Sequence, residues 1–162
     1  MTRVWRVCKR LHAEVAFTGE GAGRYGGRWN PRGIAVVYTA ETLSLALLEV
    51  LVHVDPRQAP RDLVGIPVDL PDGLALEEVR EEDLPKGWGK LPAPVSLARL
   101  GAEWARSQRT VALVVPSVVN PVERNVLLNP RHPDFVLLEK GELVHVPIDP
   151  RLVSRRKRAG RE

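Results

Sequence analysis

A single carboxylate lies inside the most apolar helix that the sequence predicts. Glu49 is the only charged side chain between Leu43 and Val52 in the segment ETLSLALLEVLVHV. Its neighbours one helical turn away are apolar residues and a histidine, so the carboxylate is expected on or beside the buried face. Burial there is unfavourable unless cations or hydrogen-bond donors compensate the charge. Such a carboxylate can stabilise an oxocarbenium ion while a glycosidic bond breaks; the structural alternative is an ion pair with an arginine.

A second unusual segment, GRYGGRWNPRG at 23–33, places cationic and aromatic side chains on a glycine-rich backbone. Glycine allows the backbone to approach a ligand closely, and the Arg28 guanidinium offers a bidentate fork for a phosphate group. The segment contains neither the dinucleotide-binding glycine pattern nor a P-loop lysine. Two interpretations of Arg28 therefore stay open, a phosphate-binding residue and an ordinary surface or structural arginine.

Two polar side chains stand at the ends of predicted strands. Tyr38 closes the apolar run IAVVYT, and Ser117 follows the run TVALVVP. Ligands tend to bind at such strand ends in sheets that are flanked by helices. Tyr38 is alternatively a core tyrosine, and Ser117, which lacks the glycine-flanked elbow of a hydrolase nucleophile, is a ligand contact or a turn residue. The loop that follows contains Asn120, Asn125 and Asn129, which are either loop formers or ligand contacts; turn chemistry explains them well enough.

The elements that must hold these side chains in place alternate irregularly along the chain. We predict strands at 4–11, 34–39, 63–70, 110–116, 134–138 and 142–148, helices at 41–54 and 97–107, and loops at 13–32, 71–95 and 117–135. Ser96 is expected to cap the second helix, and Pro67 places the strand 63–70 near an edge of the sheet. The pattern is not a regular βαβ series, which favours a single α+β domain with a central mixed β-sheet.

The composition is that of an ordinary folded domain. The 162 residues are 44% hydrophobic and 27% charged, which fits one domain with its own core. No apolar run approaches the roughly 18 residues that span a bilayer, and the start MTRVWRVCKR does not resemble a signal peptide. Cys8 is the only cysteine, which fits a reducing cytoplasm, and the four scattered histidines predict no metal site.

The net positive charge of the chain is confined to its last nine residues. The segment SRRKRAGRE, residues 154–162, carries five basic residues and one acidic residue, so that residues 1–153 contain 19 of each. A folded part without net charge argues against direct binding of nucleic acid. We expect residues 154–162, called the basic tail below, to be disordered and either solvated or in contact with RNA or an acidic partner.

Together these residues resemble the RES-domain family, the toxin components of bacterial toxin–antitoxin pairs. The resemblance rests on two long segments, GRYGGRWNPRGIAVVYTAETLSLALLEVLVHV and VPSVVNPVERNVLLNPRHPDF, and extends over residues 3–150. The family is named for an arginine, a glutamate and a serine, which fall here at Arg28, Glu49 and Ser117. The spacing of Arg28, Tyr38 and Glu49 also agrees with the family pattern.

The resemblance implies a fold similar to the diphtheria-toxin-like ADP-ribosyltransferases, with NAD+ as substrate and no prosthetic group. It implies catalytic roles for Glu49, Arg28, Tyr38 and Ser117. Glu49 is expected to hold the nicotinamide ribose and stabilise its oxocarbenium ion, Arg28 to contact the diphosphate or the adjoining ribose, and Tyr38 to flank the nicotinamide ring. Ser117 and Asn120 are expected to contact NAD+ as well, Ser117 by orienting the ribose or the carboxamide.

The implied function is cleavage of the nicotinamide–ribose bond of NAD+ by hydrolysis or phosphorolysis, which depletes NAD+ and arrests growth. One alternative is transfer of ADP-ribose to a protein, and another is binding of a nucleotide or RNA without chemistry. The implied partner is an antitoxin with an Xre-type helix-turn-helix domain, with a homodimer of the toxin as one arrangement inside that complex. Binding to membranes is not expected. We therefore predict a cytoplasmic protein in which residues 1–153 form the RES-like catalytic domain.

Overall fold

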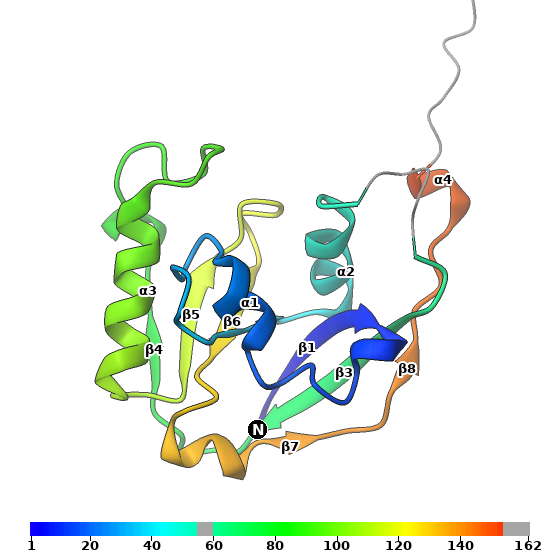
Figure 1. Ribbon diagram of the computed structural model, residues 1–162, viewed down its shortest axis with the longest axis horizontal. Helices are drawn as coiled ribbons and strands as arrows, with labels where there is room; N and C mark the ends of the chain where they lie inside the picture. Colours follow the sequence, from blue (N-terminus) through cyan, green and yellow to red (C-terminus); the bar gives the residue numbers. More distant parts are fainter. Residues whose placement is uncertain (55–59, 154–162) are drawn as a thin grey trace, which may run out of the picture.

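The fold is an α+β arrangement built on one mixed sheet (Figure 1). The computed structural model describes residues 1–54 and 60–153, so the basic tail lies outside the described residues. The strands are β1 (Thr2–Lys9), β2 (Val37–Ala40), β3 (Leu63–Leu70), β4 (Leu76–Glu78), β5 (Ala112–Pro116), β6 (Arg124–Leu128), β7 (Glu139–Lys140) and β8 (Val144–His145). The helices are α1 (Glu20–Tyr25), α2 (Leu43–Leu51), α3 (Val95–Ser107) and α4 (Pro150–Val153).

The strand order in the sheet is β4-β5-β6-β2-β1-β3, and both β7 and β8 pair with the outer edge of β3. Strands β4 and β5 are parallel and the other described pairs are antiparallel, which confirms the predicted mixed sheet. The expectation that Pro67 places its strand near an edge is also confirmed. Among the described residues, the sheet continues beyond β3 only in the two-residue strands β7 and β8, which pair on either side of Pro67.

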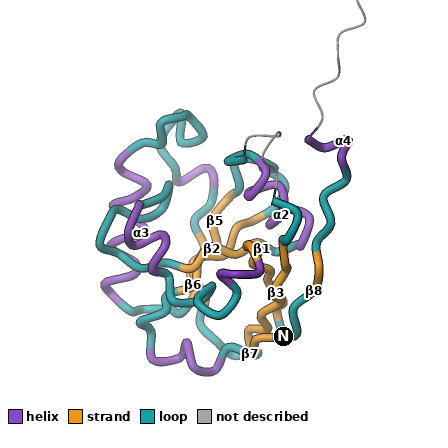
Figure 2. Tube along the Cα trace, turned by 45° about the vertical axis from the view of Figure 1, so that its right-hand side comes forward, coloured by secondary structure: helices purple, strands orange, loops and turns teal. Residues whose placement is uncertain are grey.

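Helices α2 and α3 cover the same face of the sheet. Tyr38 and Ala40 lie two residues apart on β2 and therefore share a face; Tyr38 packs in the apolar cluster of α3, and Ala40 packs in the cluster of α2. Figure 1 shows α3 beside β4 and β5 and α2 beside β1, and Figure 2 shows the strands at the centre with helices around them. Within the described residues, none of the helices combines the length and apolar character that crossing a membrane requires.

The predicted long helix is confirmed in type but is shorter than expected. It runs over Leu43–Leu51 instead of 41–54. Thr42 is its N-cap, because the Thr42 hydroxyl accepts a hydrogen bond from the backbone N–H of Leu45 at 3.0 Å. After Val52 the backbone N–H groups of His53 and Val54 donate to carbonyls three residues earlier, which tightens the chain and ends the α-helix.

The second predicted helix, α3, is confirmed, but the predicted cap at Ser96 is wrong. The helix begins at Val95, two residues earlier than predicted, with Pro94 at the N-cap position and no side chain bonded to the first turn. Ser96 therefore lies inside the first turn. Pro94, whose ring fixes its φ angle, stands at the N-cap position instead. Leu97 and Trp104 are fully buried on the apolar face, as expected from their spacing.

Several segments that were expected to be loops contain regular elements. Helix α1 lies inside 13–32, β4 inside 71–95, and β6 inside 117–135. Strand β6 is the important correction, because it occupies the middle of the sheet between β5 and β2. Its five residues are followed closely by Pro130, and so short a run has too little periodicity to reveal a strand.

The C-terminal part of the chain also differs from the expectation. The strand predicted at 134–138 is wrong, since Pro133–Leu137 forms a 3-10 helix. His132 caps this helix, because its Nδ1 accepts a hydrogen bond from the backbone N–H of Asp134 at 3.0 Å. The strand predicted at 142–148 is reduced to β8. Of the remaining predicted strands, 63–70 is confirmed with the same bounds, and the others are confirmed with ends that differ by up to three residues.

Strands β1 and β2 are neighbours that share a single residue pair, Trp5 with Ala40. By contrast, β1 pairs along its full length with β3, and β2 pairs along its full length with β6. The sheet is therefore open at its centre, between β1 and β2. Helix α2 follows β2 directly and packs against both strands, so it covers this opening.

Candidate active site

A cavity of about 120 Å³ lies where β1 and β2 separate. Its walls are formed by Trp5, Arg6, Val7, Tyr38, Thr39, Ala40, Ala46, Glu49, Val50 and Asn125. Pockets for drug-sized ligands measure about 300–1,000 Å³, so this cavity accommodates one part of a larger ligand. Two wider surface hollows, each of about 450 Å³, are lined by none of the site residues expected from the sequence.

Helix α2 places the half-buried Glu49 carboxylate at the wall of the cavity. Glu49 Oε1 accepts hydrogen bonds from Ser117 Oγ at 2.8 Å and from Asn125 Nδ2 at 2.6 Å. Among the described residues, none donates to Oε2, and no ion pair joins Glu49 to an arginine. Two neutral donors thus fix the carboxylate without cancelling its charge, and one oxygen stays open to a ligand.

Ser117 is fully buried directly after β5, and its hydroxyl positions Glu49. While Ser117 Oγ donates to the carboxylate, it accepts hydrogen bonds from the backbone N–H groups of Val119 and Asn120, each at 3.1 Å. A hydroxyl has one donor and two acceptor positions, so these three bonds use its full capacity. The Ser117 side chain is therefore held in one orientation, aimed at Glu49.

The Asn120 side chain lies outside the set of cavity-lining residues. Its Nδ2 donates to Glu123 Oε2 at 2.9 Å, and the other oxygen of Glu123 accepts a hydrogen bond from the Thr42 hydroxyl at 2.9 Å. These bonds join the loop after β5 to the start of α2. Asn120 thus supports the position of the helix that carries Glu49.

Tyr38 connects the cavity to the glycine-rich segment 23–33. The Tyr38 hydroxyl donates to Asn30 Oδ1 at 2.7 Å and accepts from the backbone N–H of Trp29 at 3.1 Å. A Cβ at Gly27 would lie 2.6 Å from the phenol oxygen, so only glycine permits this contact. Burial raises the pKa of Tyr38 to about 12, against a smaller opposing effect of the Trp29 N–H.

Asn30 organises the same segment from inside. It is almost completely buried, and its Nδ2 donates to the carbonyl oxygens of Ala22 and Ile34 at 2.9 Å each. Since its Oδ1 accepts from Tyr38, the Asn30 side chain is saturated with protein partners. The segment is therefore a fixed part of the fold and not a loose surface loop.

Arg28 belongs to the electrostatic surroundings of Glu49. Burial lowers the pKa of Arg28, and the negative charge of Glu49 partly opposes this effect. The guanidinium itself donates to two backbone carbonyls, those of Trp88 and Lys90. Arg28 thus ties the glycine- and proline-rich loop around Trp88 to the edge of the site.

Arg6, on β1, is the basic side chain among the described residues that line the cavity. Its Nη1 donates to the backbone carbonyl of Tyr38 at 2.8 Å, in the region where β1 and β2 have ceased to pair. Burial lowers the pKa of Arg6, with a smaller opposing effect of Cys8. Arg6 Nε is buried and has no hydrogen-bond partner among the described residues.

The structure brings together three of the predicted residues, Glu49, Tyr38 and Ser117, whereas Arg28 donates to the carbonyls of Trp88 and Lys90 and is not among the residues that line the cavity. Sequence reasoning missed Arg6 and Asn125. Asn125 was explained by turn chemistry, whereas it lies in β6 and binds Glu49. The sequence offered no clear signal for Asn125, because the strand that carries it is too short to be recognised from its own residues. The described residues contain no group of three or more His, Cys, Asp or Glu side chains that could hold a metal ion.

Known proteins share this fold and sequence over most of the chain. The structure matches the crystal structure of the M. tuberculosis MbcT–MbcA toxin–antitoxin complex with a TM-score of 0.70 and 18% identity, over 93% of this chain and 86% of that one. A Toxin Res from Yersinia enterocolitica is 36% identical over 92% of this chain and 98% of its own length. A Prs ADP-ribosylating toxin from a Sphingobium species is 38% identical over 95% of this chain and 98% of its own length. The RES domain model matches residues 3–149, and the chain therefore belongs to the RES domain family.

Proposed function

We propose that this protein is the toxin of a type II toxin–antitoxin pair and that it cleaves the bond between nicotinamide and ribose in NAD+. The Glu49 carboxylate carries the proposal, because Ser117 and Asn125 hold it at the cavity wall with one oxygen unengaged. As nicotinamide leaves, positive charge develops on the ribose ring, and a fixed carboxylate in a partly buried site stabilises that charge. The names of the relatives, Toxin Res and Prs ADP-ribosylating toxin, support the proposal.

The other predicted residues act around this carboxylate. Ser117 works through Glu49 by fixing its Oε1. The Tyr38 ring lines the cavity and flanks the nicotinamide, while its hydroxyl holds the segment that carries Arg28. Arg28 contacts the diphosphate or the adjoining ribose, and its bonds to two loop carbonyls exchange for bonds to the substrate. Asn120 contacts NAD+ by a similar exchange with Glu123.

Water or inorganic phosphate is the acceptor of the ADP-ribosyl group in this proposal. Transfer to a protein is the second candidate, and the name of the Sphingobium relative favours it. The two reactions leave the ADP-ribose part of NAD+ in different products, so a label on that part distinguishes them. Incubation of NAD+ labelled in its ADP-ribose part with a cell lysate should yield only small labelled products, whereas label retained on a protein band would support transfer.

The partner that we propose is an antitoxin with an Xre-type helix-turn-helix domain that blocks the site, in a complex where the toxin can form a homodimer. The match to a toxin of a crystallised toxin–antitoxin complex supports this proposal through the shared fold. We place the reaction in the cytoplasm, with NAD+ as substrate and no prosthetic group. Residues 1–153 form the catalytic domain in this proposal, and the RES match ends just before that boundary.

The experiment that tests the proposed function is nicotinamide release from NAD+ by the purified protein and by its Glu49→Gln variant. Glutamine keeps an oxygen that accepts from Ser117 and Asn125 but removes the charge, so the fold should persist. Turnover should fall by about 100-fold or more. Glu41→Gln is the matched control, since Glu41 is exposed and precedes the same helix. Near-full activity of Glu49→Gln, with Glu41→Gln equally active, would disprove the mechanism.

A further inference from the structure

Two of the three arginines in the segment 23–33 take no part in the site described above. Arg24 and Arg32 are exposed, and among the described residues no carboxylate lies within ion-pair distance of either. The backbone N–H of Gly33 donates to the carbonyl oxygen of Gly23 at 2.8 Å, so the neighbouring positions, which carry the two arginines, lie close together. Both guanidinium groups are therefore presented to solvent by one fixed segment.

Helix α3 adds two more arginines beside this segment. One of the wider surface hollows, with a volume of about 450 Å³, lies between the two elements. Its lining consists of Pro31, Arg99, Ala102, Glu103, Arg106 and Ser107. Arg99 and Arg106 are both exposed, and a spacing of about two helical turns puts them on the same side of the helix. Figure 1 shows the segment after α1 beside α3, so arginines from two elements surround one hollow.

The face around this hollow carries an excess of positive charge. Among the described residues that line the hollow, Glu103 is the only acidic one, and its carboxylate lies 3.6 Å from Arg109 Nη1. Neither Arg99 nor Arg106 forms an ion pair within the described part of the chain. A solvated arginine without a partner contributes little to folding, so the fold does not require these charges. Although residues 1–153 carry no net charge, one face of the domain is positive.

The same face presents the residue types that carry binding energy at protein interfaces. Tyr25, beside Arg24, is 70% exposed. An added Cβ at the following Gly26 would lie 3.4 Å from the backbone nitrogen of Arg32, so this turn packs next to the Pro31 side of the hollow. Tyrosine and arginine are enriched among the residues that dominate binding between proteins. Because the segment is a fixed part of the fold, binding here costs little backbone entropy.

We propose that this face is a docking surface for an acidic peptide segment of a partner protein. The surface, called the basic platform below, consists of Arg24, Tyr25, Arg32, Arg99 and Arg106. Carboxylates of the partner pair with the planar guanidinium groups, and one apolar side chain of the partner enters the hollow between Pro31 and Ala102. No residue of the basic platform lines the cavity beside Glu49, so the proposal does not depend on the proposed function.

The arrangement favours a peptide over a nucleic acid. Proteins that bind single strands without sequence preference offer a continuous basic groove to successive phosphate groups. Here Glu103 stands between Arg99 and Arg106 on α3 and interrupts the positive surface. A peptide can use that position, because its backbone N–H groups donate to a carboxylate, whereas the phosphate groups of a nucleic acid have no hydrogen to donate.

Fluorescence anisotropy of the full-length protein tests the proposal. The probe is a labelled peptide in which leucines alternate with pairs of glutamates, and its matched control peptide has glutamine in place of every glutamate. The variant combines Arg99→Gln with Arg106→Gln. Glutamine is about as good a helix former as arginine, so α3 should persist. Binding of the glutamate peptide should weaken about fivefold or more.

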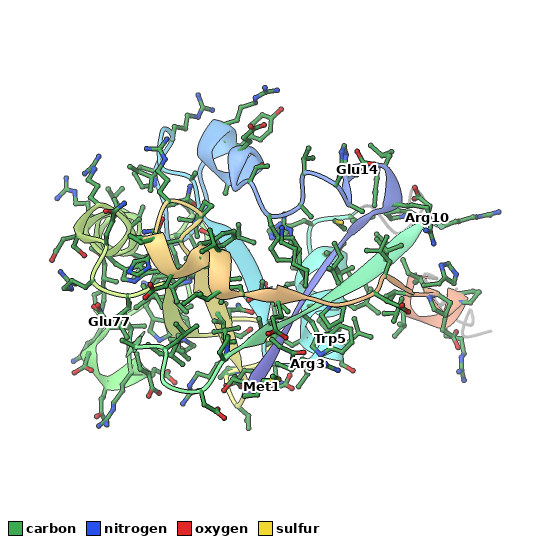
Figure 3. All side chains as sticks on the ribbon, turned by 90° about the horizontal axis from the view of Figure 1, so that it is seen from below. Met1, Arg3, Trp5, Arg10, Glu14 and Glu77 are labelled. Carbon is green, nitrogen blue, oxygen red and sulfur yellow. The ribbon has the colours of Figure 1, made fainter. Side chains whose placement is uncertain are left out.

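The matched control variant combines Lys9→Gln with Arg10→Gln, which removes the same two charges from exposed positions elsewhere. Figure 3 shows Arg10 and Glu77 at opposite ends of the molecule, and Glu77 pairs with Arg109, just after α3. Attraction of the peptide to the overall charge, including that of the basic tail, should change equally in both variants. The affinity of this control should therefore stay within about twofold of wild type.

Each outcome of these titrations decides the proposal. Binding that prefers the glutamate peptide and weakens only in the α3 variant supports it. Equal weakening in both variants, no preference for the glutamate peptide, or no binding by wild type overturns it. So does tighter binding of an oligothymidylate that the α3 variant weakens, because that result assigns the face to nucleic acid. If thermal unfolding shows that the α3 variant is not folded, Arg24→Gln combined with Arg32→Gln takes its place. Nicotinamide release does not enter this test, so failure of the proposed function leaves its outcome readable.

Discussion

At the scale of the residue, Tyr38 shows how one hydroxyl can organise a site. The hydroxyl donates to the side chain of Asn30 and accepts from the backbone N–H of Trp29. It therefore holds both of the residues that follow Arg28. Trp29 and Asn30 are almost inaccessible to solvent, so water cannot replace the Tyr38 hydroxyl as their hydrogen-bond partner. The position of Arg28 therefore depends on the Tyr38 hydroxyl as well as on its own contacts.

The raised pKa of Tyr38 predicts a pH dependence of stability. Burial raises this pKa to about 12 from the ordinary value of 10.0, so the folded protein holds the phenol proton more tightly than the unfolded chain. This contribution to stability is complete below about pH 10 and is lost as the pH rises toward about 12. The free energy of unfolding of wild type should fall by about 1.4 kcal/mol more per pH unit than that of Tyr38→Phe. Parallel curves from urea titrations between those pH values would contradict this.

Residues that are unusual in their local sequence could be predicted, and residues that are ordinary there could not. Glu49 could be found because a lone carboxylate in an apolar helix needs an explanation. Arg6 sits in the basic strand VWRVCKR, where a further arginine attracts no notice, and Asn125 sits among turn-forming residues. Their roles arise from the separation of β1 from β2 and from the central place of β6, which are properties of strand pairing.

At the scale of the element, helix α3 supports the glycine-rich segment from the side. Gly101 of α3 faces the backbone of Trp29 so closely that an added Cβ would overlap the Trp29 carbonyl oxygen. Trp29 belongs to one apolar cluster with three buried residues of α3, namely Leu97, Trp104 and Ala105. The close approach of the helix thus fixes the backbone next to Arg28.

This contact predicts that Gly101→Ala displaces the segment that carries Arg28. The overlap should lower the free energy of unfolding by about 1–3 kcal/mol and raise KM for NAD+. Gly21→Ala, in α1, is the matched control because a Cβ there meets nothing within 4 Å, and alanine favours the helix by up to about 1 kcal/mol. Urea unfolding and nicotinamide release measure both effects. Equal behaviour of the two variants would show that α3 does not support the segment.

Elements with a long apolar or periodic signal were predictable, and short ones were not. The segment that became α2 has many leucines and no glycine or proline, so its type was clear and only its ends were wrong. Strand β6 has five residues between proline-rich turns, and its assignment depends on neighbours on both sides, β5 and β2. Such a strand is stabilised by tertiary pairing, which local propensity does not contain.

At the scale of the whole molecule, charge is divided sharply between the domain and the basic tail. Residues 1–153 contain equal numbers of basic and acidic residues. If they form the catalytic domain, removal of residues 154–162 should leave both the unfolding midpoint and the kcat/KM for NAD+ within about twofold of wild type. Thermal unfolding and nicotinamide release test this. A large, salt-sensitive loss of activity on truncation would instead give the tail a part in binding the anionic substrate.

The hydrogen bonds of Glu49 have a consequence for how the protein is made. Its two donors lie 68 and 76 residues further along the chain, so the site does not exist in any N-terminal fragment that stops before Asn125. During synthesis the ribosome therefore releases nearly the whole domain before the carboxylate is held in place. Under the proposed function, a nascent chain would have no activity until β6 has inserted, which would give an antitoxin an interval in which to bind first.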